Sequence, residues 1–210
     1  MLNVDNQIVI EELEKLFPNA KCELNYRNVY ELSVAVILSA QTSDASVNKI
    51  TPILFDKYPT LKELSAAKYE DVFMIISPLG LAQRKAEYLI KFSNTVLNSY
   101  DGIVPNTIDE LVKIPGIGRK TANVIVSEGY GLPGLAVDVH VTRVSKRLGF
   151  ANEIATPDQI EKILKMYFPI EKWHDIHHKL IFMGRYLCKS QKPECFRCPF
   201  TNNCQYFKTK

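Results

Sequence analysis

The sequence lacks the patterns of membrane, secreted and disordered proteins. It has no apolar run of transmembrane length, and its start, MLNVD, lacks the basic and apolar regions of a signal peptide. Internal repeats and low-complexity stretches are also missing. With 46% hydrophobic residues among 210, the chain is long enough for one large domain or two small ones with real cores. We expect a globular, cytoplasmic protein.

Strand patterns are missing as well. Apolar residues recur at helical spacing almost throughout, without convincing alternation, so we predict an all-α fold. Thr107 with Glu110 has the spacing of a capping box, and Ser43 or Asp44 is suited to cap the next helix. The best internal boundary is GYGLPG at 129–134. The predicted helices are Asn6 to Phe17, Val29 to Ser39, Asp44 to Tyr58, Leu61 to Ala66, Tyr69 to Ile76, Ala82 to Ser99, Thr107 to Lys113, Gly118 to Gly129, Val139 to Leu148, Pro157 to Tyr167 and Lys172 to Cys188.

Net charge is low, at +3, and by itself says little about nucleic acid. Its distribution is more informative, because the stretch from Arg185 to Lys210 has six basic residues against one acidic residue, Glu194. From charge alone, this basic tail is equally well explained as a phosphate-contacting surface or as a solvated segment.

The glycine-rich stretch from Leu111 to Ala122, LVKIPGIGRKTA, carries the most information about function. Gly116 and Gly118 lack a Cβ, so a turn there can bring backbone N–H groups up to a phosphate oxygen. Apolar residues on both sides fit two short helices packed across the turn. This is a helix-hairpin-helix pattern, which contacts the sugar-phosphate backbone without reading sequence.

Two ionisable residues add chemistry to this turn. Lys120 lies in the first turn of the following helix, where the positive dipole end disfavours an ammonium and favours a neutral, nucleophilic amine. Asp138 is a carboxylate suited to accept protons. A lone lysine is usually a solvated charge and a lone G-x-G usually an ordinary loop, but their combination points to chemistry on DNA.

The sequences IPGIGRKTA at 114–122 and VDVHV at 137–141 together resemble the signature of the endonuclease III family of DNA glycosylases. LSAQTSD at 38–44 and the C-terminal cysteines extend the resemblance over nearly the whole chain. It implies a base-excision-repair enzyme that removes oxidised pyrimidines from double-stranded DNA and cuts 3′ to the abasic site by β-elimination. Lys120 would be the Schiff-base nucleophile, assisted by Asp138. The implied protein is a monomer with no membrane partner, at work in the cytoplasm at the nucleoid.

The resemblance also implies a layout and DNA contacts. A six-helix domain at 22–132 would face a discontinuous domain of 1–21 and 133–210 across a cleft that holds DNA. Gln41 and Leu81 would enter the base stack, although without the family Leu81 would be interpreted as a core residue and Gln41 as a solvated one. Gly116, Gly118 and Arg119 would contact the backbone from the hairpin.

A few positions depart from related branches or stay without a role. Adenine-removing relatives generally lack the lysine and carry a catalytic Glu where this chain has Val36, so that activity is disfavoured. Val139 stands where close relatives often have Thr, which removes no proposed catalytic group. We expect His140 to pack rather than to react. No role is assigned to His174, His177 and His178.

Four of the five cysteines are crowded near the C-terminus, which in a chain without a signal peptide argues for a metal rather than for disulfides. Four thiolates suit zinc or an iron–sulfur cluster, and their chemistry leaves the choice open. The resemblance implies a [4Fe-4S] cluster, whose loop would present Lys189, Lys192 and Arg197 to phosphates. Cys22, remote from the group, is expected to be at least partly buried. The ligands would be Cys188, Cys195, Cys198 and Cys204.

Three other interpretations remain open. A non-catalytic helix-hairpin-helix module would use Lys120 only to contact phosphate. An iron–sulfur electron carrier would use the cysteines and show little affinity for DNA. Among enzymes, a glycosylase specific for pyrimidine dimers or for mismatches has the same motifs, since pocket shape decides the base.

Overall fold

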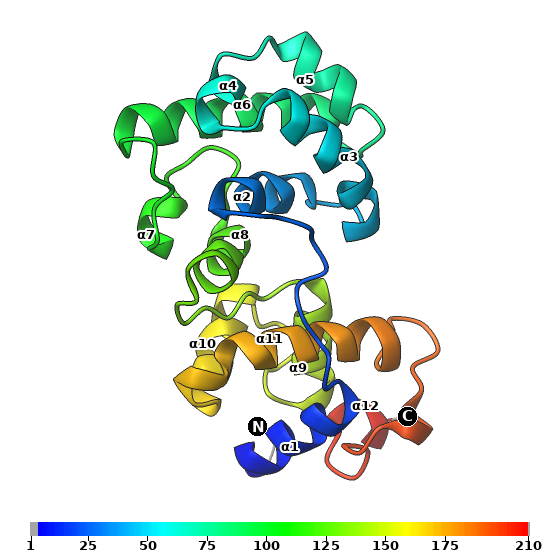
Figure 1. The fold of residues 1–210 in the computed structure, drawn as a ribbon. Helices are drawn as coiled ribbons and strands as arrows, with labels where there is room; N and C mark the ends of the chain where they lie inside the picture. The colour runs from blue at the N-terminus through cyan, green and yellow to red at the C-terminus, as the bar shows by residue number, and fades with distance from the viewer. Residues whose placement is uncertain (1–3, 210) are drawn as a thin grey trace. The chain divides into compact units, whose positions relative to one another are not determined.

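The computed structural model describes residues 4–209, which contain helices and no strand (Figure 1). Two compact units make up the chain: Glu23–Leu132, and a discontinuous unit of Met1–Cys22 with Pro133–Lys210. The predicted bounds, 22–132 and 1–21 with 133–210, differ from these units in the place of Cys22. The α-helices are α1 (Asn6–Leu16), α2 (Val29–Leu38), α3 (Asp44–Lys57), α4 (Leu61–Ser65), α5 (Tyr69–Ile76), α6 (Ala82–Ser99), α7 (Ile108–Leu111), α8 (Arg119–Val124), α9 (Val139–Leu148), α10 (Pro157–Tyr167), α11 (Trp173–Phe182) and α12 (Gln205–Lys208).

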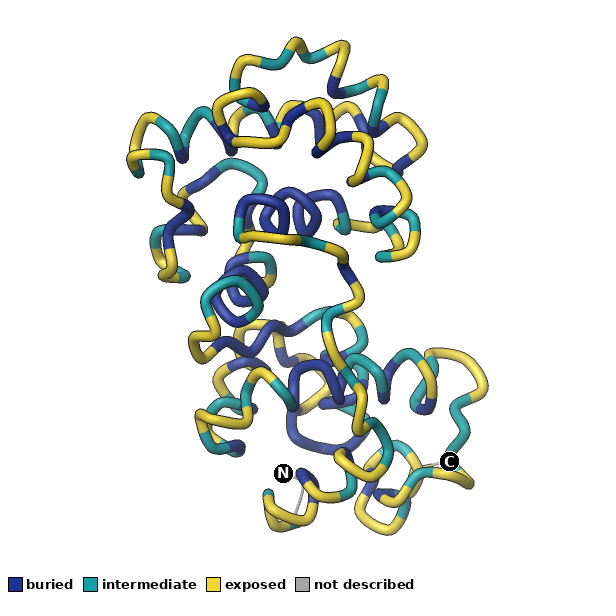
Figure 2. The backbone as a smooth tube through the Cα atoms, viewed as in Figure 1, coloured by how far each residue is buried: buried dark blue, intermediate teal, exposed yellow. Residues whose placement is uncertain are grey.

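In the Glu23–Leu132 unit the central element is α2, which is buried along nearly its whole length (Figure 2). Its sequence, VYELSVAVIL, is apolar nearly all round, and such a helix has to be enclosed by others. It packs against α3, α6 and α8, and the long helix α6 packs in turn against α4 and α5. The strongly enclosed α2 thus fixes the places of the helices that carry the candidate site in this unit.

In the discontinuous unit the central element is α9, which packs against α10, α11 and α12. The N-terminal helix α1 joins this unit by packing on α11. There the buried ammonium of Lys179 is paired with Glu14 of α1 and with Asp175. Burial acts to lower the pKa of Lys179, but the hydrogen bonds to the two carboxylates outweigh it and raise the pKa above its usual value. The pairing ties the first helix to a segment more than 160 residues away.

The structure confirms the all-α prediction, and it refines several elements. The predicted helices Gly118 to Gly129 and Lys172 to Cys188 each contain a π-helical turn, at Ile125–Gly129 (η1) and Met183–Leu187 (η3). Apolar periodicity over one turn cannot separate these wider turns from an α-helix. The predicted Thr107 to Lys113 helix is limited to Ile108–Leu111, although the Thr107 hydroxyl does accept from the Glu110 amide. Sequence patterns also missed three short elements, α12 and the 3₁₀ turns η2 (Ile170–Lys172) and η4 (Cys195–Arg197).

No helix within residues 4–209 is both long enough and apolar enough to cross a lipid bilayer.

Phe92 provides a test of the core, because this α6 side chain is fully buried. We expect Phe92→Ala to lower the free energy of unfolding by about 3–5 kcal/mol, because it removes a large apolar side chain and leaves a cavity. Urea unfolding followed by circular dichroism measures the change. The control is Met74→Ala, since Met74 is 69% exposed, and it should change the value little. Equal losses of unfolding free energy in the two variants would contradict the burial of Phe92 in the core.

Candidate nucleic-acid interface and metal centre

The turn between α7 and α8 is built around Gly116. This residue has φ +87°, a left-handed conformation that side-chain-bearing residues rarely adopt. A Cβ added there would lie 2.8 Å from the Cβ of Tyr88, on α6. Leu111, Ile114 and Ile117, the apolar residues on the N-terminal side, are buried as predicted. The sequence therefore folds here into the predicted hairpin, and glycine is required at position 116 for two independent reasons.

The first turn of α8 follows directly from this hairpin. Gly118 is the N-cap, with φ −91° and ψ 174°, and no side chain of the described residues caps this end. The first N–H groups of a helix have no partner within the helix, so they are available to an anion. Lys120, the second residue of α8, is exposed, as is Arg119. The hairpin amides and the candidate nucleophile thus lie within one short segment.

Asp138 is the N-cap of α9, in the discontinuous unit. Its Oδ1 atom accepts hydrogen bonds from the amides of His140 and Val141, both at 2.8 Å. The two bonds fix the carboxylate, and Oδ2 accepts no hydrogen bond from residues 4–209. The residue is half-buried. One oxygen of Asp138 therefore orients the group, and the other is available to accept a proton.

The two predicted stack-entering residues lie at turns of the Glu23–Leu132 unit. Gln41 follows α2, and Leu81 is the N-cap of α6. Gln41 is exposed, and Leu81 is 50% exposed rather than part of the core. Both have positive φ, at +53° and +61°, which is uncommon for residues other than glycine. Both side chains are therefore presented from bent turns at helix ends.

The four C-terminal cysteines line one mainly apolar cavity of the discontinuous unit, and none of them forms a disulfide. Burial raises the pKa of the Cys198 thiol to about 11 and also raises that of Cys204. Metal ligation requires thiolates, so a bound cation would have to displace these protons. Cys22 is half-buried, which agrees with expectation. The donor set fits a metal centre held by four sulfur ligands.

Two arginines of α9 donate hydrogen bonds to backbone carbonyls at and around Cys188. The sequence analysis did not single out either of them. Arg143 donates from Nε to the carbonyl of Cys188 at 3.1 Å and from Nη2 to that of Gly184 at 2.7 Å. Arg147 donates to the carbonyls of Lys189, at 2.6 Å, and Ser190, at 3.0 Å. Their i, i+4 spacing puts both on one face of α9, and this spacing was the available signal.

His140 is half-buried beside these groups. Its Nδ1 lies 3.1 Å from Nη2 of Arg143, and a Cβ added to Gly184 would lie 2.7 Å from its Cβ. Burial lowers the pKa of the imidazole. These contacts place His140 in the packing between α9 and η3.

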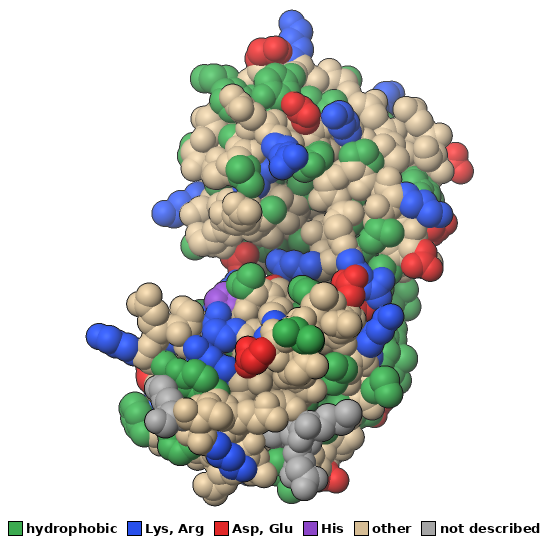
Figure 3. All heavy atoms as spheres, turned by 180° about the vertical axis from the view of Figure 1, so that it is seen from behind, with side chains coloured by type: hydrophobic (Ala, Val, Ile, Leu, Met, Phe, Trp, Pro, Cys, Tyr) green, Lys and Arg blue, Asp and Glu red, His purple; other side chains and the backbone are tan. Residues whose placement is uncertain are grey.

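The predicted cations of the cysteine loop are partly neutralised. Glu194 accepts from Nζ of Lys189 at 2.6 Å and from Nη1 of Arg197 at 2.7 Å, and these bonds lower its pKa. Lys192 is exposed, with φ +47°. Figure 3 shows Lys and Arg side chains in groups on one face, with acidic side chains between them. Surface pairs of this kind are weak, because water and salt screen them. Lys210, the end of the basic tail, lies outside the described residues.

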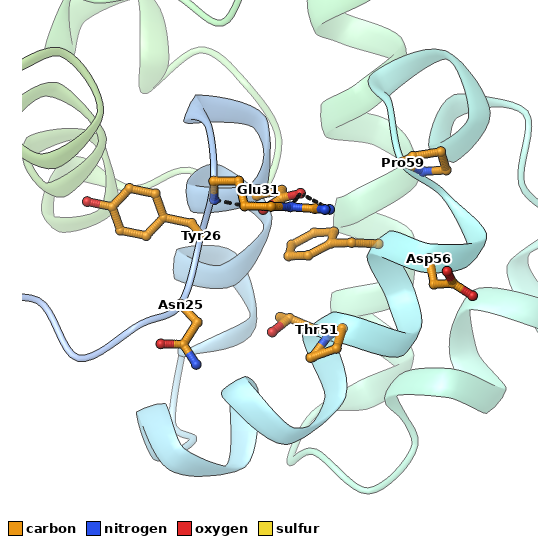
Figure 4. Close-up of a pocket in the computed structure, with 9 residues that line it drawn as sticks. Asn25, Tyr26, Glu31, Thr51, Asp56 and Pro59 are labelled. Carbon is orange, nitrogen blue, oxygen red and sulfur yellow. Dashed lines mark hydrogen bonds and ion pairs between the residues drawn. The ribbon is translucent and has the colours of Figure 1, made fainter.

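A separate pocket lies between the N-terminal end of α2 and the C-terminal half of α3 (Figure 4). Its polar wall is the ion pair of Arg27 with the buried Glu31, and Phe55 forms part of its apolar wall. None of the predicted site residues lines this pocket. It is therefore not the candidate site.

Comparison with known proteins decides the family. A family model described as HhH-GPD superfamily base excision DNA repair protein matches residues 34–169. Endonuclease III of Bacillus subtilis (strain 168) is 45% identical over 206 residues, which cover 98% of this chain and 94% of that protein. Endonuclease III of Escherichia coli (strain K12) is 39% identical over 198 residues, 94% of this chain and 93% of that protein.

The chain belongs to the endonuclease III family.

A solved structure of a trapped endonuclease III–DNA covalent intermediate, an estranged-adenine complex, agrees with this assignment. It has a TM-score of 0.94 and 45% identity and covers 98% of both chains. A thermostable thymine-DNA glycosylase, with 21% identity and a TM-score of 0.88, shows the fold alone. Membership of the endonuclease III family confirms the predicted helix-hairpin-helix glycosylase fold and the enzyme class, a DNA glycosylase and abasic-site lyase.

The two hairpin glycines of this endonuclease III chain differ in what they tolerate. We expect Gly116→Ala to lower the free energy of unfolding by about 1–3 kcal/mol, because the new methyl group overlaps Tyr88 in a strained backbone conformation. Gly118→Ala is the matched control, since its φ is ordinary and a Cβ there meets no atom within 4 Å. Thermal unfolding of both variants measures the difference. Equal stabilities would contradict the close approach of Gly116 and Tyr88.

Proposed function

We propose that this enzyme removes oxidised pyrimidines from double-stranded DNA and then cuts the strand 3′ to the abasic site. The observation that carries the proposal is the exposed Lys120 directly after the hairpin amides. The hairpin can grip the sugar-phosphate backbone while the amine reaches a sugar carbon on the same strand. A solved relative with 45% identity is a trapped covalent intermediate with DNA, which supports covalent chemistry here.

Lys120 serves as the nucleophile for both activities. Its neutral amine attacks C1′ of the nucleotide, the bond from C1′ to the base breaks, and the base leaves with the bonding electrons and gains a proton. Opening of the sugar ring then gives an imine between Nζ and C1′. The imine acidifies the C2′ hydrogen, so removal of that proton expels the 3′ phosphate by β-elimination.

Asp138 assists Lys120 as a proton acceptor and as a negative charge. Its Oδ1 is engaged by the two α9 amides, so Oδ2 is the oxygen that would take a proton. A fixed carboxylate also stabilises the positive charge that develops on the sugar as the base leaves. Its role thus depends on the cap geometry at the start of α9.

The base has to leave the stack before this chemistry begins, at a cost of roughly a few kcal/mol. Gln41 and Leu81 are proposed to enter the duplex and fill the vacated space, since both lie exposed at bent turns. Gly116, Gly118 and Arg119 would contact the backbone, joined by Lys189, Lys192 and Arg197 from the cysteine loop. The proposed partner is therefore duplex DNA with damaged pyrimidines or abasic sites. We also propose that the enzyme acts as a monomer, in the cytoplasm at the nucleoid.

Cys188, Cys195, Cys198 and Cys204 are proposed to hold a [4Fe-4S] cluster. Four thiolates suit either a single zinc ion or an iron–sulfur cluster. Membership of the endonuclease III family favours the cluster. When bound, the cluster would join the four cysteine thiolates and so cross-link a loop with few apolar residues. Base removal needs no electron transfer.

Borohydride trapping tests the nucleophile. Wild-type enzyme with a duplex containing thymine glycol or an abasic site should give a covalent adduct, and Lys120→Ala should give none, because no amine remains to form the imine. Lys113→Ala, an exposed lysine on the other side of the hairpin, is the control and should trap like wild type. No adduct with wild type would support the non-catalytic binding module, and an adduct of normal yield with Lys120→Ala would show that another amine is the nucleophile.

Metal content tests the cysteine centre. We expect purified wild type to contain about four irons per chain, and Cys195→Ser to lose most of the iron and to unfold more readily, because the loop loses a cross-link. Cys22→Ser, outside the group, should keep the iron. Elemental analysis and visible absorption measure this. One zinc per chain would overturn the cluster assignment.

A further inference from the structure

The turns that present Gln41 and Leu81 both need outside support. Each residue has a positive φ, in a region that non-glycine residues rarely occupy. Each side chain is largely exposed, so it is not held by burial in the core. The backbone of the two turns must therefore be held by contacts from neighbouring residues.

Lys85 connects the two turns. It lies in the first turn of α6, where its amide donates to the carbonyl of Leu81 at 3.0 Å. Its Nζ donates to Oγ1 of Thr42 at 2.7 Å. The Thr42 hydroxyl in turn donates to the carbonyl of Ala40 at 3.4 Å, so the hydrogen bonds flank Gln41 on both sides. One residue thus contacts both turns, through its backbone and through its side chain.

The two turns also lie against each other. A Cβ added at Gly80, the residue before Leu81, would lie 3.6 Å from the carbonyl oxygen of Gln41 and 3.8 Å from Oγ1 of Thr42. These are ordinary van der Waals distances, and all four residues belong to the Glu23–Leu132 unit. The two turns therefore lie close together, with room for little more than a methyl group between them at Gly80.

Burial of the Lys85 amine costs free energy, which indicates that the amine has a structural role. The residue is only 2% exposed, and burial lowers its pKa. Among the described residues, its amine donates to the Thr42 hydroxyl and forms no ion pair with a carboxylate. An apolar side chain of similar length would fill the same space without this cost. What the amine adds is the hydrogen bond to the turn of Gln41.

We propose that Lys85 is a positioning residue that joins the turns of Gln41 and Leu81, so that the two side chains enter the duplex as one wedge. The inference rests on the proposed function of these residues. The contacts of Lys85 are to the two turns, so in this proposal it acts on opening of the duplex and not on bond breaking.

The test compares two substrates with Lys85→Met, which keeps the length and removes the amine. We expect strand cleavage at an abasic site in a duplex to slow about tenfold, the size of a broken interaction between neighbouring groups. Cleavage of the single-stranded abasic oligonucleotide should stay unchanged, since there is no duplex stack to enter. Lys91→Met, an exposed lysine on the same helix with a side chain 59% accessible, is the control and should match wild type on both substrates.

Variants of Thr42 and Leu81 test the same proposal if Lys85→Met folds poorly. Thr42→Val removes the acceptor and should slow duplex cleavage, while Thr42→Ser keeps the hydroxyl and should restore it. Fluorescence of 2-aminopurine opposite the abasic site should rise on binding of wild type and rise less with Thr42→Val. In a Leu81→Ala background, Thr42→Val should cost less than half of its effect in wild type, because both changes disable one wedge.

The outcomes separate the two proposals. If wild type forms no borohydride adduct with either substrate, the proposed function fails. If wild type traps normally and Lys85→Met and Thr42→Val cleave the duplex at wild-type rates, the positioning role alone is overturned. Equal losses on duplex and single strand would show a general structural role and would also overturn it.

Discussion

The close approach of Gly116 to Tyr88 is the contact on which the candidate site depends most. With its backbone in the left-handed region and no room for a Cβ, position 116 admits glycine and little else. The bend fixes where α8 begins, and therefore where its first amides and Lys120 lie. The apolar residues of the hairpin are buried, so this geometry is supported by the core of its unit rather than by a mobile loop. A rigid turn of this kind is suited to hold a DNA backbone in register with an amine, since small displacements of a nucleophile greatly reduce its rate.

In the discontinuous unit, α9 supports candidate functional groups along its length, from its N-cap to its later turns. Its N-cap is Asp138, fixed by two amide bonds, and one face further along carries Arg143 and Arg147, which bind carbonyls of the cysteine loop. The guanidinium of Arg147 also lies 4.2 Å from the ring centre of Tyr206, two residues after Cys204. One helix thus supports the proton acceptor and the cysteine loop, so a disturbance of the loop is expected to reach Asp138 through α9.

Local features of the candidate site are visible in the sequence, whereas contacts between distant residues are not. Gly116, Lys120 and the four cysteines were identified because turn chemistry, helix position and ligand spacing are written in consecutive residues. Lys85 has no such signal, and the spacing of Arg143 and Arg147 predicts a shared helix face but not its partner. A lysine or arginine at helical spacing looks like a solvated charge until the fold shows it buried or bonded to a distant carbonyl. Leu81 is the opposite case, because its apolar side chain suggests a core position although it is exposed. Only the family resemblance predicts an exposed tip there. The π-turns after α8 and α11 were missed because one widened turn hardly changes an apolar pattern.

The most direct test of the account is to locate the covalent bond itself. Wild-type enzyme is reduced with borohydride on an abasic duplex, the adduct is digested with nuclease and protease, and the peptides are analysed by tandem mass spectrometry. The account predicts that the deoxyribose-derived mass lies on Nζ of Lys120, in a peptide that begins after Arg119. A sugar remnant on any other amine would contradict the central claim that the hairpin places residue 120 against the sugar.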